Sequence, residues 1–167
     1  DQAQMEAGKL TINMGPVKPS ELLENLHSLL DKTASDKNLS LTSEMDDSLP
    51  ETLIGDSARL QQILVNLVTN AVKFTDKGSV SVRLFHLPEL RKWGIEVSDT
   101  GRGIPHHELP HIFETFRQVE GAATRTQGGF GLGLAIVRQL VNLLNGDIKV
   151  ASEPDKGTTF TITLPLV

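Results

Sequence analysis

The sequence of 167 residues has no cysteine, no long apolar run and no excess of basic residues. Without cysteine, the chain forms neither disulfides nor thiolate metal sites, which fits a reducing compartment. No apolar stretch approaches the roughly 20 residues that span a bilayer, and no signal segment opens the chain. We therefore expect a cytoplasmic domain that makes no membrane contact itself, whether or not a longer parent protein is membrane-anchored.

The charge balance argues against a nucleic-acid surface. The chain has 16 Lys and Arg against 21 Asp and Glu, a net charge of -5, whereas phosphate contacts need clustered basic side chains. With 38% hydrophobic residues, a chain of this length suits one domain with its own core. Because the first residue is Asp1 rather than methionine, we expect a piece of a longer protein.

Internal repeats and low-complexity tracts are also absent, so the order of the expected elements is the main clue to the fold. Apolar residues that alternate predict strands, and apolar residues three and four apart predict amphipathic helices. The expected strands cover residues 9–14, 39–45, 80–84, 95–97, 148–150 and 160–164. The expected helices cover residues 22–30, 60–71 and 134–144. This order predicts an α+β fold: a two-layer sandwich with helices packed on one face of a mixed sheet.

The second expected helix carries a polar stripe opposite its apolar one. At about 100° per residue, Gln62, Asn66, Asn70 and Lys73 share a face. Two carboxamides and an ammonium at this spacing suit a hard cation and phosphate charge, as in a site for a magnesium–nucleotide complex. Taken alone, the stripe is explained more simply as the solvated face of a surface helix.

Two glycine-rich segments follow. In residues 99–104, DTGRGI, a carboxylate that follows a strand can accept a hydrogen bond from an exocyclic amine, and glycines let a base approach the backbone. A tight turn explains that segment equally well. Residues 128–133, GGFGLG, run directly into an apolar helix, where free backbone amides favour an anion such as phosphate. A flexible hinge is the alternative there.

The second segment matches neither common glycine-rich phosphate motif. Leu134 stands where a dinucleotide fingerprint has its last small residue, and no Gly-Lys-Ser/Thr follows as in a P-loop. Residues 118–129, just before it, are polar and aperiodic, which predicts a mobile loop. Residues 107–111, HELPH, fit the zinc motif H-E-x-x-H, but Pro110 opposes the continuous helix that the motif needs, so we reject zinc.

In order and spacing, five segments resemble the boxes of the ATP-binding catalytic domain of two-component sensor histidine kinases, a branch of the Bergerat-fold superfamily shared with DNA gyrase and heat-shock chaperones. The segments are residues 60–75 (N box), 99–104, 112–119 (phenylalanine box), 129–133 and 157–160. The resemblance covers nearly the whole chain. It implies a fold of the Bergerat type, ATP and Mg²⁺ as ligands, and a mobile ATP lid at residues 118–129.

The resemblance also assigns roles to residues. It implies that Asn70 holds Mg²⁺ and that Asn66 and Lys73 assist at the metal and the phosphates, which makes these three the expected catalytic residues. Asp99 is expected to bond the adenine amine. The remaining expected nucleotide-binding residues are Phe74, Gly101, Gly103, Ile104, Phe116, Gly129, Gly131, Leu132, Gly133 and Thr159. Core packing explains the phenylalanines at least as well, and Phe130 departs from the small residue that many relatives carry.

The resemblance implies residues 1–15 as the end of a linker from a dimerisation helix plus a first strand, and residues 16–167 as the catalytic domain. None of the five histidines lies in the family's phosphoacceptor pattern. The expected partners are therefore the dimerisation and histidine-phosphotransfer domain of the same parent and a downstream response regulator receiver domain.

In the hydrolysing relatives an acidic residue at the place of Asn66 activates water, and an amide cannot accept that proton. The expected activity is therefore phosphoryl transfer to histidine. A regulatory nucleotide-binding module without transfer, or a Bergerat-fold ATPase, remains the alternative.

Overall fold

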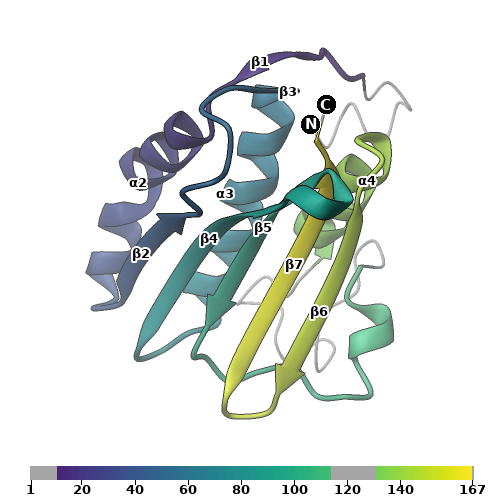
Figure 1. Cartoon of the computed structure of the whole chain (residues 1–167). Helices are drawn as coiled ribbons and strands as arrows, with labels where there is room; N and C mark the ends of the chain where they lie inside the picture. The colour runs from purple at the N-terminus through teal and green to yellow at the C-terminus, as the bar shows by residue number, and fades with distance from the viewer. Residues whose placement is uncertain (1–10, 114–130, 167) are drawn as a thin grey trace.

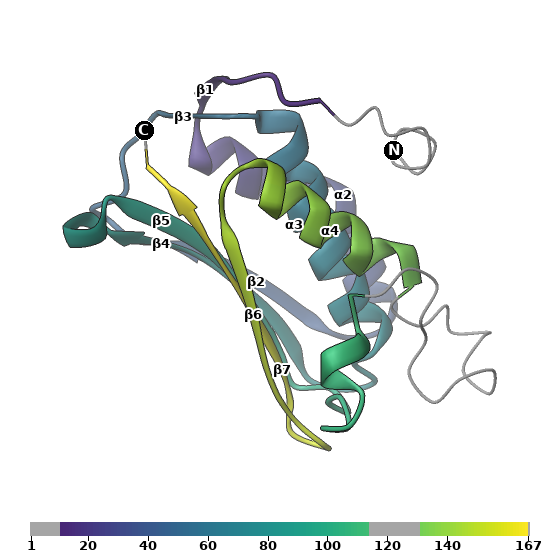
Figure 2. The same ribbon diagram turned by 90° about the vertical axis from the view of Figure 1, so that its right-hand side faces the viewer.

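Three α-helices form where apolar residues recur every three or four positions in the described part of the chain, residues 11–113 and 131–166. They are α2 (Pro19–Asp36), α3 (Ser57–Lys73) and α4 (Gly131–Leu143). In this computed structural model, all three helices lie on one side of a sheet, and no described helix covers the other side (Figures 1 and 2). The predicted two-layer α+β arrangement is confirmed.

The sheet has five strands in the order β2-β4-β5-β7-β6. The strands are β2 (Ser40–Met45), β4 (Ser79–Leu87), β5 (Lys92–Asp99), β6 (Asp147–Glu153) and β7 (Gly157–Pro165). β2 runs parallel to β4 and every other pair is antiparallel, so the sheet is mixed as predicted. Between β4 and β5 the chain turns through a 3-10 helix, Pro88–Leu90, and the left-handed residue Arg91.

The strand predicted at residues 9–14 is wrong for its described part. Residues 11–14 form no strand, and β1 is instead Gly15–Val17, paired with a short β3 at Leu53–Gly55. The amide of Asn13 donates to the Asp56 carboxylate (2.7 Å) rather than to a strand partner. The apolar alternation in this segment therefore does not mark a buried face, and Met14 is 54% exposed.

The core lies between the helices and the sheet, with α3 at its centre. Side chains of the predicted stripe, such as Ile63, Leu64 and Val68, are fully buried, and so are Ile95 and Ile162 of the sheet. The Asp56 carboxylate caps α3 by accepting from the Arg59 amide (3.1 Å). On α2 the apolar side chain of Leu29 lies outside the buried face of the helix and is 58% exposed.

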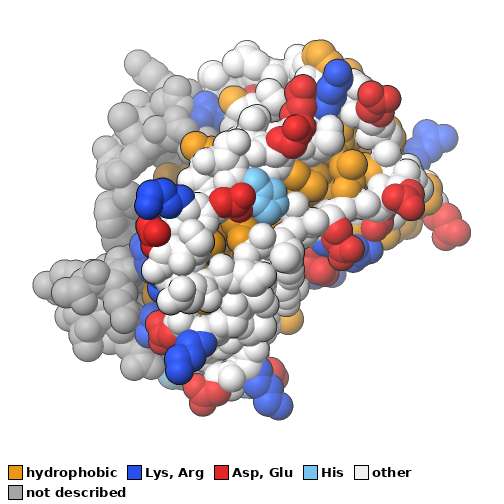
Figure 3. Space-filling view, turned by 90° about the vertical axis from the view of Figure 1, so that its left-hand side faces the viewer, with side chains coloured by type: hydrophobic (Ala, Val, Ile, Leu, Met, Phe, Trp, Pro, Cys, Tyr) orange, Lys and Arg blue, Asp and Glu red, His pale blue; other side chains and the backbone are white. Residues whose placement is uncertain are grey.

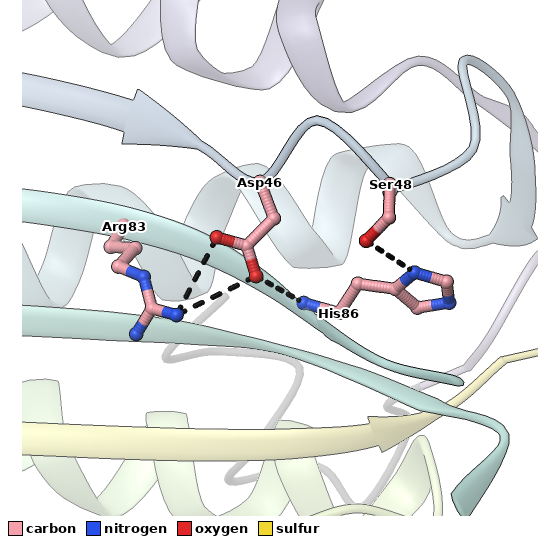
Figure 4. Close-up of polar contacts among 4 residues, drawn as sticks. All are labelled: Asp46, Ser48, Arg83 and His86. Carbon is pink, nitrogen blue, oxygen red and sulfur yellow. Dashed lines mark hydrogen bonds and ion pairs between the residues drawn. The ribbon is translucent and has the colours of Figure 1, made fainter. Parts of the chain in front are cut away.

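The edge strand β2 is fixed at its end by a polar cluster (Figure 4). The Asp46 carboxylate accepts from the backbone amide of His86 (2.9 Å) and contacts Arg83 Nη2 (3.5 Å), both on β4. Ser48 Oγ lies 3.0 Å from His86 Nδ1. Figure 3, seen from the side of α2 and β2, shows hydrophobic side chains in a hollow among charges of both signs.

Candidate functional site

The polar stripe on α3 divides into a buried and an exposed part. Asn70 is only 7% exposed, Asn66 is half-buried, and Lys73, the last residue of the helix, is exposed. Gln62, further toward the N-terminus, accepts from Arg59 Nη1 (3.1 Å). Of the stripe, Asn70 lines a pocket at the C-terminal end of α3.

This pocket has about 320 Å³ of empty space, part of it open to solvent. The end of α3, the end of β5, the loop after β5 and the start of β7 form its walls. The lining residues are Leu67, Asn70, Ala71, Phe74, Asp99, Gly103, Ile104, Thr158 and Phe160. The structure thus brings together several residues that the sequence singled out: Asn70, Phe74, Asp99, Gly103 and Ile104.

Asp99 ends β5 and turns its carboxylate into the loop that follows. Its Oδ1 accepts from the backbone amide of Gly101 (2.8 Å). Burial raises the pKa of the Asp99 carboxyl, although hydrogen bonds from the backbone amides of Gly101 and Thr158 act to lower that pKa. A half-buried carboxylate held by backbone donors keeps a fixed direction, which suits it to accept a hydrogen bond from an amine.

The glycines of this loop are required by the protein itself. A Cβ at Gly101 would lie 2.5 Å from the Phe74 carbonyl oxygen and 2.8 Å from Thr75 Oγ1. Gly103 has a φ of 74°, and a Cβ there would collide with the Glu153 carbonyl. Gly103 also lines the pocket, whereas Gly101 is not among the lining residues. Tight backbone packing therefore explains both glycines, and only Gly103 borders the space available to a ligand.

The end of the second glycine-rich segment lies beside Asn70, although none of its described residues lines the pocket. Gly131, Leu132 and Gly133 form the first turn of α4. A Cβ at Gly133 would lie 3.5 Å from Asn70 Nδ2, so this turn lies against the amide-bearing side of α3. Other predicted features lie outside the described residues: Phe116, Gly129, Phe130 and the lid at residues 118–129.

The prediction of Thr159 needs correction by one residue. Thr158 is 6% exposed and lines the pocket. Thr159 Oγ1 lies 2.5 Å from Ser98 Oγ, and both side chains stand on the opposite face of the sheet. Successive strand residues point to opposite faces, so an offset of one residue moves the side chain away from the site.

The sequence reasoning also missed four lining residues: Leu67, Ala71, Thr158 and Phe160. A signal for them was present. Leu67 lies three positions before Asn70 and Ala71 lies four positions after Leu67, so Leu67 borders both on the helix surface. Phe160 follows Thr158 by two on a strand and therefore shares its face.

A sequence model of the family described as "Histidine kinase-, DNA gyrase B-, and HSP90-like ATPase" matches residues 55–167, which include every residue of the pocket. The chain belongs to this ATPase family. The match begins just before α3 and ends beyond β7, so it spans the elements that build the site.

Relatives of the ATPase domain are sensor histidine kinases. BarA of Escherichia coli (strain K12) is 39% identical over 167 residues, which cover 96% of this chain and 18% of that protein. The autoinducer 2 sensor kinase/phosphatase LuxQ of Vibrio harveyi is 39% identical over 170 residues, 99% of this chain and 20% of that protein. The chain therefore spans about a fifth of the length of these relatives.

Solved structures of histidine kinases share the fold. Full-length ShkA in complex with AMPPNP matches with a TM-score of 0.85 and 31% identity, over 99% of this chain and 34% of that chain. The catalytic domain of histidine kinase ThkA matches with a TM-score of 0.77 and 26% identity, over 92% of this chain and 95% of that chain. The predicted family, and with it a fold of the histidine kinase ATP-binding type, is confirmed.

Aromatic side chains support the wall of the pocket. The Arg102 guanidinium carbon lies 4.8 Å from the centre of the Phe74 ring, which lines the pocket. Phe113 packs edge-to-face on Phe160 with ring centres 6.2 Å apart, and Arg138 lies over Phe113 at 5.5 Å. Phe113 thus buttresses a pocket residue from behind, in line with a packing role.

The zinc-like sequence lacks the arrangement that zinc requires. Residues 109–111 form a 3-10 helix, Leu109–His111, which contains Pro110. Two histidines four positions apart share one face only on a continuous α-helix. Within residues 11–113 and 131–166, no group of three or more potential ligands is arranged to hold a metal ion. Over the same residues, no helix has both the length and the apolar character to cross a bilayer.

Proposed function

We propose that this domain binds ATP with Mg²⁺ and donates the γ-phosphoryl group to a histidine on the dimerisation domain of the same parent protein. The observation that supports this most is the shared pocket of Asn70 on α3 and Asp99 at the end of β5, with the first turn of α4 beside Asn70. A nucleotide site needs a group for the metal, one for the base and one for the phosphates, and these three parts suit those roles.

The adenine would occupy the side of the pocket formed by Asp99, Ile104 and Phe74. The Asp99 carboxylate accepts a hydrogen bond from the exocyclic amine, and the apolar side chains border the flat base. Phe74, Ile104 and Phe160 supply this apolar wall. A carboxylate also disfavours a base that presents a carbonyl oxygen at the same place, so the site should select adenine over guanine.

The phosphates would lie toward Asn70 and the start of α4. Mg²⁺ prefers oxygen ligands and needs only one or two from the protein when phosphates supply others, so the Asn70 amide oxygen fits as its ligand. Free amides in the first turn of a helix favour a phosphate. Asn66 and Lys73 are proposed to assist, since the half-buried amide precedes Asn70 by one helical turn and the exposed ammonium ends the helix. When bound, Mg²⁺ would offset the charge of the phosphates.

Catalysis would then rest on positioning. A histidine acceptor brings its own nucleophilic nitrogen, so the domain has to hold the γ-phosphate and stabilise its charge. An amide at Asn66 supplies no base to activate water, which disfavours hydrolysis. We propose that the phosphohistidine then donates its phosphoryl group to a receiver domain. We also propose that the ATP-binding domain works in the cytoplasm.

The test mixes this chain with ATP labelled at the γ-phosphate, Mg²⁺ and a separately prepared dimerisation domain of the parent. Acid-labile label on that partner is the expected result. Nucleotide binding without label on the partner would support a regulatory module instead. Steady release of phosphate without any partner would support an ATPase.

A further inference from the structure

The hairpin between β6 and β7 packs directly against residues 99–104, here called the adenine loop. The backbone amide of Asp155 donates to the Arg102 carbonyl (2.6 Å). A Cβ at Gly103 would collide with the Glu153 carbonyl, and a Cβ at Gly157 would collide with the Asp99 carbonyl. Figure 1 shows this hairpin at the lower end of the sheet. The conformation of the adenine loop therefore depends on a hairpin some fifty residues later in the chain.

One hydroxyl joins the two segments. Ser152 Oγ on β6 accepts from the Ile104 amide (2.7 Å) and donates to the Gly157 carbonyl (3.0 Å). It also lies 2.8 Å from Thr158 Oγ1. A serine oxygen has one hydrogen and two lone pairs, so these three contacts satisfy its full capacity when Thr158 donates. Two of the three partners, Ile104 and Thr158, line the nucleotide pocket, whereas Ser152 does not.

We propose that Ser152 is a positioning residue for adenine binding, which acts by holding Ile104 and Thr158 in the wall of the pocket. This inference rests on the proposed function. Ile104 is 1% exposed and Thr158 is 6% exposed. If the Ser152 hydroxyl were removed, neither residue could readily form a hydrogen bond to water in its place. A buried amide without a partner is costly, and a shift of the adenine loop toward solvent relieves that cost.

The chain offers a matched control on the other face of the same sheet. Ser98 on β5 and Thr159 on β7 form a second pair of hydroxyls, with Ser98 Oγ 2.5 Å from Thr159 Oγ1. That pair stands away from the pocket. Removing its serine hydroxyl changes a hydrogen bond of the same chemistry without touching Ile104 or Thr158. A general loss of stability and a specific loss of adenine positioning are thereby separated.

The experiment compares Ser152→Ala, Ser152→Thr and Ser98→Ala in the 167-residue chain. By titration calorimetry, Ser152→Ala is expected to raise the Kd about tenfold for ATP, ADP and adenosine alike, because loss of about one hydrogen bond at the adenine end affects all three equally. Ser152→Thr retains the hydroxyl and is expected to bind within about threefold of wild type, as is Ser98→Ala. Equal affinities of Ser152→Ala and Ser98→Ala would overturn the proposal, as would equal losses in the alanine and threonine variants.

A second measurement does not depend on nucleotide. Hydrogen exchange of the Ile104 amide is expected to be faster in Ser152→Ala than in wild type or Ser98→Ala, because that amide loses its acceptor. Unchanged exchange would overturn the positioning role even if affinity fell. If the wild-type chain binds no nucleotide while Ile104 exchange responds as expected, the proposed function fails and only the mechanical link between hairpin and loop stands.

Discussion

At the scale of single residues, the pocket contains two polar side chains that are partly or fully removed from solvent. Asn70 is a buried polar side chain near the end of α3, and Asp99 is a carboxylate whose pKa is raised by burial. Burial of polar groups costs stability unless partners compensate. Both residues line the pocket proposed to bind a nucleotide, and each leads to a prediction.

Replacement of Asn70 by alanine is expected to abolish the Mg²⁺-dependent part of ATP affinity, because the variant lacks the amide oxygen proposed to hold the metal. Titrations of ATP with and without Mg²⁺ measure that part directly. Asn142→Ala, an exposed asparagine on α4, is the control and should leave affinity unchanged. Unchanged metal dependence in Asn70→Ala, with the fold intact by circular dichroism, would remove Asn70 from the site.

Replacement of Asp99 by asparagine is expected to change the pH dependence of stability. Because burial raises the folded-state pKa above the ordinary value of 3.8, the folded protein binds this proton more readily than the unfolded chain. Its contribution to stability is thus present at low pH and is lost as pH rises from the unfolded to the folded pKa. Denaturant unfolding between pH 3 and pH 7 should therefore favour wild type over Asp99→Asn increasingly toward acid. The opposite slope would contradict the raised pKa.

At the scale of elements, α3 carries the site and is held at both ends. The Asp56 carboxylate caps its N-terminus, and at its C-terminus Lys37 Nζ donates to the carbonyls of Val72 (2.7 Å) and Lys73 (3.2 Å). A cation is favourable at this end of a helix, where carbonyls lack helical partners. These hydrogen bonds hold the last turn of α3, which is followed directly by the pocket residue Phe74.

Lys37→Met keeps most of the side-chain volume and removes the two hydrogen bonds. We expect the free energy of unfolding to fall by about 1 kcal/mol, the usual scale for a charge at a helix end. Chemical denaturation measures this. Lys32→Met is the matched control: it removes an exposed ammonium that pairs with Asp36 on α2 (3.4 Å), and no measurable change is expected. Equal effects of the two variants would show that Lys37 does not cap α3.

Element by element, periodicity predicted the long segments and failed on the short ones. The stripe of α3 and the alternation of β4 and β7 extend over enough residues to indicate a buried face. β3 has only three residues, too few for any period, and the alternation at residues 11–14 has no partner strand. Motif position predicts Thr159, whereas the alternation of side chains along β7 places Thr158 in the pocket.

At the scale of the whole molecule, the pocket opens where the end of β5 meets the hairpin of β6 and β7. Its lining residues extend from Leu67 to Phe160, so the site depends on contacts between distant parts of the chain. Local sequence patterns could identify Asn70 and Asp99 but could not show the hydroxyl link from Ser152 to Ile104. That contact depends on how two turns pack against each other. Neither turn has a sequence pattern that predicts this packing.

Gly157→Ala tests how tightly this junction is closed. Gly157 has a φ of 126°, and a Cβ there would collide with the Asp99 carbonyl. We expect a loss of about 2–4 kcal/mol in the free energy of unfolding, from backbone strain together with the steric clash. Gly15→Ala is the control, since a Cβ at Gly15 meets nothing within 4 Å. Similar free energies of unfolding of the two variants would show that the hairpin shifts to accommodate the added methyl group at little cost.

The strand order has a consequence for how the molecule is assembled. β7 is the last strand in this sequence, yet it lies inside the sheet with β5 on one side and β6 on the other. Until β7 inserts, both neighbours present unpaired edges, and such edges invite pairing with other chains. The ribosome therefore releases β7 after the two strands that it joins, so Thr158 and Phe160 are added to the pocket wall after all of its other lining residues.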